Sequence, residues 1–250
     1  MVLIGWSGFV IAFVILLAAA SQNQNNIPVQ SEPIIDINYN KGLYFIDAPE
    51  VKTLIVDGLQ KELHSYSVKE LNINKLEKDI LTNPYIKSAE AYTDVQGTLR
   101  VKIVQREPIV RVINKNGVSY YLDNYGEKIP ISPKFTARVP VSNGNIDDDN
   151  SDLGAVDTPV LKDLYKLAKF IHNDKYLSAL VDQIYVNDQQ EFEIIPKIDN
   201  HTIVLGKADN LEKKFRKLYI FYREGLKNVG WHKYSTVDLR FENQIVCKKR

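Results

Sequence analysis

A run of carboxylates comes nearest, by type and spacing, to a ligand set in this sequence: Asp147, Asp148, Asp149 and Asp152. Carboxylate oxygens bind calcium in loops with the spacing D-x-[DN]-x-[DN]-G-x5-E. The run does not fit, because the glycine position holds Asp152 or Leu153, depending on the starting residue. We therefore interpret residues 145–154 as an exposed loop and predict no metal site there.

Other side chains that commonly do chemistry are scattered along the chain. The four histidines, which we interpret as surface or hydrogen-bonded core residues, are His64, His172, His201 and His232. The single cysteine, Cys247, excludes an internal disulfide, and Cys and His residues lack the spacing of a zinc site. Motifs for hydrolysis and glycine-rich phosphate loops do not occur in a supporting context. The sequence thus predicts neither catalysis nor a cofactor.

Composition describes a globular protein with little net charge. The 250 residues are 44% hydrophobic and 25% charged, which is enough apolar content for one or two buried cores. The 32 basic residues nearly cancel the 31 acidic ones, leaving a formal charge of +1. Because binding to nucleic acid depends on a strongly positive field, this balance argues against nucleic acid as a partner.

Residues 1–20 predict a membrane anchor. Residues 2–20 contain no charge and no proline, and as a helix these nineteen residues would extend roughly 28 Å, enough to cross a bilayer. A cleaved signal peptide is the alternative, since three alanines precede Ser21. We favour the uncleaved helix, because the apolar stretch is longer than an ordinary signal sequence and no basic segment precedes it.

The residues that follow this stretch predict its orientation. Positions 21–40 contain no Lys or Arg, whereas Glu32 and Asp36 are present. Cytoplasmic flanks are usually rich in Lys and Arg, so this flank is expected on the outer side. We interpret residues 21–33 as a linker and expect a single-pass protein of the cytoplasmic (inner) membrane, with the bulk of the chain periplasmic.

Residues 34–107 carry the signals of a β-α-α-β-β domain. Strands are predicted at 34–39, 86–93 and 98–105, the last two joined by a turn at Gln96-Gly97. Pro49 begins a first helix that extends to about Leu63. Two helices are then expected to cover one face of a three-stranded sheet.

The second of these helices has a clear start signal. Asn74 with Glu77 forms a capping-box pattern, and Asn83-Pro84 ends the helix. Its buried face is expected to contain Leu76, Ile80 and Leu81.

Residues 108–250 predict a mixed β-domain with two helices, so the fold class is α+β. Strands are expected at 109–113, 118–122, 183–186, 191–195, 202–205 and 235–241. Thr158 with Pro159 indicates the start of the first helix, and Asp209 with Glu212 that of the second. The buried stripes are expected at Val160, Leu164, Leu167, Ala168 and Ile171, and at Leu211, Phe215, Leu218 and Tyr222.

Several motifs occur in a recognisable order. NPYI at 83–86 and REP at 106–108 flank two predicted strands, YYLDNYGEKIP follows at 120–130, and VDLRFENQIV stands at 237–246. After one apolar span and a linker, this order resembles the FtsQ/DivIB cell-division family, in a form similar to that of Bacteroidetes. The first domain resembles a POTRA domain, and the remainder resembles the family's β-domain.

The resemblance implies a non-enzymatic scaffold of the division septum that links early and late division proteins and binds the bitopic proteins FtsB and FtsL. In the family, the last strands of the β-domain and the helix before them receive the FtsB partner. Carried over by position, the partner-binding residues are Val237, Asp238, Leu239, Arg240, Phe241, Asn243, Gln244, Ile245 and Val246. Phe241 stands where many relatives have Tyr. Residues 237–241 also alternate as an unpaired edge strand would.

Two other functions remain open. A POTRA-type chaperone or secretion component would handle client strands along a sheet edge, although such proteins usually carry several units in tandem or a β-barrel. An exported, membrane-anchored enzyme is the less favoured alternative.

A reporter fused after Arg250 tests the predicted topology. If residues 1–20 are an uncleaved anchor and residues 21–40 follow on the outer side, a reporter that works only outside the cytoplasm should be active and remain in the membrane fraction. A soluble, shortened product that begins near Ser21 would contradict the anchor and support the signal peptide.

Overall fold

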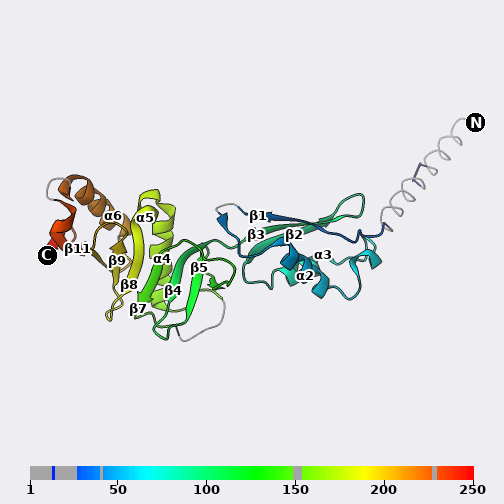
Figure 1. Ribbon diagram of the computed structural model, residues 1–250, viewed down its shortest axis with the longest axis horizontal. Helices are drawn as coiled ribbons and strands as arrows, with labels where there is room; N and C mark the ends of the chain where they lie inside the picture. The colour runs from blue at the N-terminus through cyan, green and yellow to red at the C-terminus, as the bar shows by residue number, and fades with distance from the viewer. Residues whose placement is uncertain (1–12, 15–26, 40–41, 149–153, 227–229) are drawn as a thin grey trace, which may run out of the picture. The chain divides into compact units, whose positions relative to one another are not determined.

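The computed structural model describes residues 13–14, 27–39, 42–148, 154–226 and 230–250, in two units that divide between Gln105 and Arg106 (Figure 1). The predicted anchor lies outside the described residues except for Phe13 and Val14, which are helical. Within the described part of the chain, no helix combines the length and the apolar character needed to cross a bilayer.

The first unit is built on a three-stranded sheet. Its central strand, β3 (Leu99–Gln105), lies parallel to β1 (Ile34–Asn38) and antiparallel to β2 (Ile86–Thr93). Leu99, Val101 and Ile103 alternate along β3 and are buried against the helices. The predicted β-α-α-β-β order is confirmed.

Helices α2 (Ala48–Gly58) and α3 (Ile73–Ile80) cover one face of this sheet (Figure 1). Asp47 caps α2 in a capping box with Glu50. The predicted extension of α2 to Leu63 is wrong, because the chain becomes extended after Gly58 and forms only a 3₁₀ turn, η2 (Leu63–Ser65). A Cβ at Gly58 would lie 2.7 Å from an Asp79 carboxylate oxygen, so glycine permits the close approach of α3.

The start of α3 differs from the prediction. Its cap is Asn72, whose side chain accepts a hydrogen bond from the Lys75 amide at 3.0 Å, and Asn74 lies inside the helix. Glu77 instead accepts from the Ala91 amide at 2.8 Å and so connects α3 to β2. Leu76 and Ile80 are buried as predicted, whereas Leu81, which follows the last helical residue, is exposed.

The second unit contains a mixed nine-stranded sheet in the order β12-β11-β10-β9-β8-β7-β4-β5-β6. The strands are β4 (Pro108–Ile113), β5 (Ser119–Asp123), β6 (Lys128–Pro130), β7 (Val141–Gly144), β8 (Val181–Val186), β9 (Phe192–Pro196), β10 (Thr202–Gly206), β11 (Tyr234–Asp238) and β12 (Val246–Lys249). The α+β class and the six predicted strands are confirmed, β11 with different bounds. The unpredicted β6, β7 and β12 are short and lack an alternating apolar pattern.

Three α-helices of the second unit, rather than the two predicted, lie among the described residues. They are α4 (Pro159–Asn173), α5 (Lys175–Leu180) and α6 (Leu211–Ile220), and a π-helical segment, η3 (Phe221–Gly225), extends α6. Thr158 caps α4 as predicted, and both predicted stripes are buried in one core with the strands. Asp209 does not cap α6: that position is Asn210, with a φ of 45° and no side-chain cap.

Asp148 corrects the interpretation of the acidic run as an exposed loop. Its side chain is buried and its carboxylate accepts from Lys128 Nζ at 2.9 Å and from the Tyr120 hydroxyl at 2.5 Å. Burial, together with this carboxylate, raises the pKa of Tyr120. Asp147 is half exposed and pairs with Lys115 at 2.7 Å, and Asp149 and Asp152 lie outside the described residues. The run therefore contains a structural ion pair between β6 and this loop.

Replacement of Asp148 should destabilise the second unit. Asp148→Asn removes the carboxylate charge that pairs with the buried Lys128 ammonium, which costs about 3–5 kcal/mol of unfolding free energy. Asp147→Asn is the matched control and should cost less than about 1 kcal/mol, because its pair is exposed. Urea denaturation measures both. Equal and small effects would contradict the structural role of Asp148.

Candidate functional site

The predicted partner-binding residues lie in a terminal hairpin, which we define as residues 234–249. Its first strand, β11, pairs in parallel with β10 and antiparallel with β12. The predicted continuation of this strand to Phe241 is wrong, because it ends at Asp238. The Leu239 amide donates to the Val204 carbonyl at 2.9 Å and the Arg240 amide to Asp238 Oδ1 at 3.0 Å. Neither amide therefore faces an open edge.

β12, and not β11, is the outer strand at this end of the sheet. Among the described residues β12 pairs with β11 alone. The predicted unpaired edge at 237–241 is therefore wrong, because β12 folds back against it. Val237 and Asp238 belong to β11, Val246 begins β12, and the other predicted residues form the connection between the strands.

The connection, residues 239–245, presents apolar side chains in two directions. Leu239 is fully buried and Ile245 packs against the core of the second unit. Phe241 and, at the start of β12, Val246 are 45% and 42% exposed. Because large apolar side chains that point into solvent are common in binding surfaces, these two are the residues of the hairpin best placed to contact a partner.

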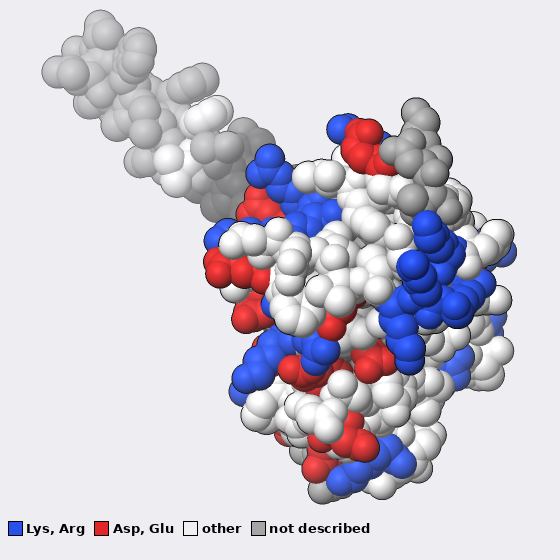
Figure 2. Space-filling model, turned by 90° about the vertical axis from the view of Figure 1, so that its left-hand side faces the viewer, with Lys and Arg blue, Asp and Glu red and all other residues white. Residues whose placement is uncertain are grey.

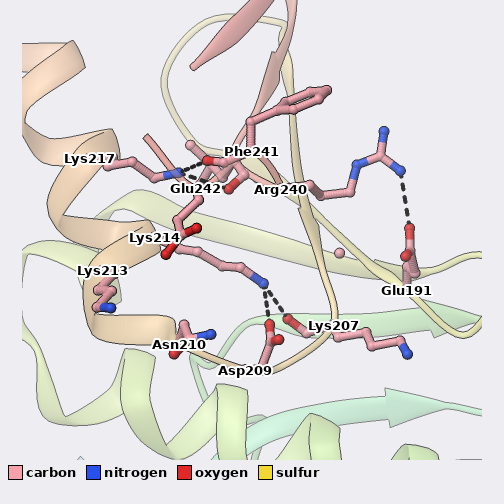
Figure 3. A pocket seen from close by; sticks show the side chains of 12 residues that line it. Glu191, Lys207, Asp209, Asn210, Lys213, Lys214, Lys217, Arg240, Phe241 and Glu242 are labelled. Carbon is pink, nitrogen blue, oxygen red and sulfur yellow. Dashed lines mark hydrogen bonds and ion pairs between the residues drawn. The ribbon is translucent and has the colours of Figure 1, made fainter. Parts of the chain in front are cut away.

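A hollow of about 420 Å³ lies beside this connection (Figure 3). It is bounded by Glu191, by the segment from Gly206 to Asn210, by Lys213, Lys214 and Lys217 of α6, and by residues 239–242. Its basic lining residues are Lys207, Lys213, Lys214, Lys217 and Arg240. Five cations in one hollow, against three acidic residues of the same lining, make it a positively charged recess.

Arg240 is held in place by two carboxylates. Its guanidinium contacts Asp238 at 2.8 Å and Glu191 at 3.3 Å, and its stem passes over Gly206, where a Cβ would lie 2.8 Å away (Figure 3). The hydrogen bonds that its guanidinium donates to Asp238 raise the pKa of Arg240. Burial opposes ionisation of Asp238, but the hydrogen bonds from Arg240 outweigh it and lower the pKa of that carboxyl. Arg240 thus fixes the start of the connection over β10.

The lysines of the recess differ in what they bind. Lys214 donates to Asp209 Oδ1 at 2.5 Å and to the Lys207 carbonyl at 2.8 Å, and the first of these bonds lowers the pKa of Asp209. Lys217 donates to backbone carbonyls of the connection. The ammonium groups of Lys207 and Lys213 have no hydrogen-bond or ion-pair partner in the described part of the chain, so they are available to an anionic group.

Asp199 fixes the opposite end of the hairpin. Its buried carboxylate accepts from His232 Nδ1, before β11, at 2.8 Å and from Arg250, after β12, at 3.1 Å. The buried His201 ring lies 3.4 Å away and contacts the Tyr222 hydroxyl at 2.5 Å. Burial opposes ionisation of Asp199, but hydrogen bonds from the Asn200 backbone and His232, with the Arg250 charge, lower its pKa to about 2. Burial lowers the pKa of His201, which stays neutral near pH 7.

The arrangement suits binding through backbone and charge. No group of three His, Cys, Asp or Glu residues among those described is placed to hold a metal ion. What the site offers is an outer strand, exposed Phe241 and Val246, and a basic recess next to them. Lys and Arg also gather on the end of the second unit where the C-terminal residue lies (Figures 1 and 2).

Known proteins share both units of this chain. Residues 107–248, which include the recess and nearly all of the hairpin, match the family described as FtsQ/DivIB, C-terminal related. The chain belongs to the FtsQ/DivIB family. Residues 31–104 match the POTRA-like domain. The resemblance inferred from the motifs is thereby confirmed.

Two relatives are each named cell division protein FtsQ. The protein of Salinibacter ruber is 25% identical over 193 residues, which cover 68% of this chain and 67% of the relative. The protein of Rhodothermus marinus is 26% identical over 175 residues, which cover 68% of this chain and 63% of the relative. The chain thus spans about two thirds of the length of these FtsQ proteins.

Sequence reasoning found part of this site. The family motif placed the hairpin residues 237–246 at positions that the structure groups together. It missed Lys213 and Lys217, although their spacing of four along a predicted helix, on the side away from Leu211 and Leu218, signalled a basic face. It also missed Asp199, which no local pattern marks.

The role of Asp199 predicts a pH-dependent stability difference. Its folded-state pKa lies below the ordinary value of 3.8, so the stabilisation is present above about pH 4 and is lost as pH falls through 2. Asp199→Asn should therefore lower the unfolding free energy by about 1–3 kcal/mol at pH 6, and this difference should shrink toward zero near pH 2.

Denaturation at a series of pH values measures this difference. Asp188→Asn, in an exposed turn between β8 and β9, is the matched control and should have little effect at pH 6. A difference for Asp199→Asn that stays constant from pH 6 to pH 2 would contradict the inference.

Proposed function

We propose that this FtsQ/DivIB-family protein is a non-enzymatic, single-pass membrane scaffold of the bacterial division machinery. Residues 1–20 anchor it, 21–33 are a linker, 34–107 form the POTRA-like domain and 108–250 the β-domain. The body lies in the periplasm at the septum, where it binds FtsB- and FtsL-like bitopic proteins and links early and late division proteins. Family membership and two relatives named cell division protein FtsQ support this proposal.

One observation supports the partner-binding role: one side of the outer strand β12 is unpaired within the described part of the chain. The Arg250 amide donates to the Lys233 carbonyl at 3.2 Å, so it points toward the rest of the hairpin. Amides alternate in direction along a strand, and hence those of Lys248 and Val246 point inward while those of Cys247 and Lys249 point outward. A partner segment can add to β12 as a further strand through these outward groups.

Charge favours a partner segment with acidic side chains. Lys248, Lys249 and Arg250 follow one another at this edge, and in the neighbouring recess the ammonium groups of Lys213 and Lys207 have no partner among the described residues. Strand addition supplies affinity through main-chain hydrogen bonds, whereas these cations select the partner by complementary charge. The exposed Phe241 and Val246 add apolar contact.

The alternative of a chaperone or secretion component has one observation in its favour. Among the residues that the structure describes, both outer strands of the first unit, β1 and β2, pair only with β3, so each leaves an edge open to a client strand. A single pair of proline variants in β12 tests the proposal directly, because a chaperone that uses the first unit does not need β12.

Lys249→Pro and Lys248→Pro should have different effects. Proline at 249 removes an outward amide, so the domain should stay folded while the FtsB-like protein of the same organism binds at least about fivefold more weakly in a pull-down. Proline at 248 removes an inward amide and should destabilise the hairpin by about 1–3 kcal/mol. Both remove the same charge, so each is the control for the other.

Complementation extends this test to the cell. Cells depleted of the protein should filament, and Lys249→Pro should fail to restore division although it accumulates as a folded protein. If Lys249→Pro binds the partner and restores division as well as the unmodified chain does, β12 is not the docking edge.

A further inference from the structure

We propose that Lys217 is the positioning residue of the docking hairpin: its ammonium sets the path of residues 239–245, so α6 and the hairpin act as one unit. Lys217 Nζ donates to the carbonyls of Leu239 at 3.1 Å and of Phe241 (Figure 3). It also donates to the carbonyl of Gln244 at 3.5 Å. The consequence for binding rests on the proposed function. The local geometry does not.

The donor count of lysine matches this geometry. A protonated lysine has three N–H groups and no acceptor, so it can satisfy three carbonyls that converge on one point. Two of these carbonyls belong to the start of the connection and the third lies near its end. A single side chain therefore holds both limbs of the turn against α6.

The connection has little else of its own to fix its path. Between Arg240 and Ile245, the described backbone groups make no backbone–backbone hydrogen bond outside the β11–β12 ladder. The Arg240 contacts hold only the first limb, and the side chain of Ile245 packs on the core at the other end. The exposed Phe241 lies between these points, and the direction in which it points depends on where Lys217 holds its carbonyl.

Lys217 differs from its neighbours on α6 in this respect. Lys214 binds the residues before the helix, and Lys213 has no partner in the described part of the chain. The helix itself is anchored by Phe215 and Leu218, which are buried in the core, so the position of Lys217 is fixed from behind. Burial, with the nearby Lys214, lowers the pKa of Lys217, while Asp238 and Glu242 oppose this change.

Replacement of Lys217 should loosen the connection without unfolding the domain. Lys217→Met keeps the aliphatic stem and removes a half-buried charge, so the melting temperature of the full-length chain should change little. Hydrogen exchange of the hydrogen-bonded Leu239 and Val246 amides, at the two ends of the connection, should become about tenfold faster, since the turn between them loses its common donor. Lys213→Met is the matched control: it removes the same charge from the same recess and should leave this exchange unchanged.

Affinity for the FtsB-like protein of the same organism is the second readout. Lys217→Met should weaken binding about five- to tenfold, Lys213→Met by less than about threefold, and Lys217→Arg, which restores a cationic donor, should recover part of the loss. Equal losses for the two Met variants, with exchange unchanged in both, would mean that Lys217 contributes only charge, and the inference would fail.

The two proposals fail in distinguishable ways. If Lys249→Pro abolishes binding while Lys217→Met alters neither exchange nor affinity, β12 is the docking edge and the positioning role of Lys217 is wrong. If Lys217→Met speeds exchange but neither variant alters affinity, the hairpin is not the docking site, and the inference is overturned as a statement about binding.

Discussion

The parallel pairing of β10 with β11 is the constraint on which the functional end of the molecule depends. Two consecutive parallel strands require a crossover, and here α6 makes it across the core face of the sheet. Its stripe of Leu211, Phe215 and Leu218 is buried. Lys213 and Lys217, on the other side of the helix, therefore line the recess beside the connection that follows β11. The basic recess and the hairpin are therefore neighbours as a result of topology, and their chemistry follows from it.

The hairpin is then fixed at its two ends by opposite charges. At the turn, the Lys217 ammonium donates hydrogen bonds to carbonyl oxygens of the connection. At the open end, the Asp199 carboxylate accepts hydrogen bonds from His232 and Arg250. Each uses a single buried or half-buried charge to hold segments that lack a regular ladder between them. Because a buried charge without partners is costly, both ends are set in one arrangement rather than several.

The sequence predicted the parts of the fold that repeat a local signal. The stripes of α4 and α6 follow helical periodicity and are buried as predicted, and the strand predicted at 98–105 is β3, whose alternate apolar residues are buried. The wrong predictions have a common cause. Similar local signals occur at neighbouring positions, and contacts with residues far away in the sequence decide between them. The sequence alone does not distinguish Asn72 from Asn74 as the cap of α3. It likewise does not show that Asp148 is buried, because its partners Lys128 and Tyr120 are distant in the sequence.

The candidate site was predicted from the family motif, and the backbone pairing corrected which of its strands is outermost. Alternation in residues 237–241 suggested an edge strand, but VCKK at 246–249 has too few apolar residues to be recognised as the strand that covers it. That same composition explains how β12 stays outermost, because lysines on an outer strand discourage pairing between identical chains through charge repulsion. A segment rich in acidic residues removes the repulsion and gains the free backbone groups. In the proposed function, the charges that protect the strand from its own copies are also the ones that select its partner.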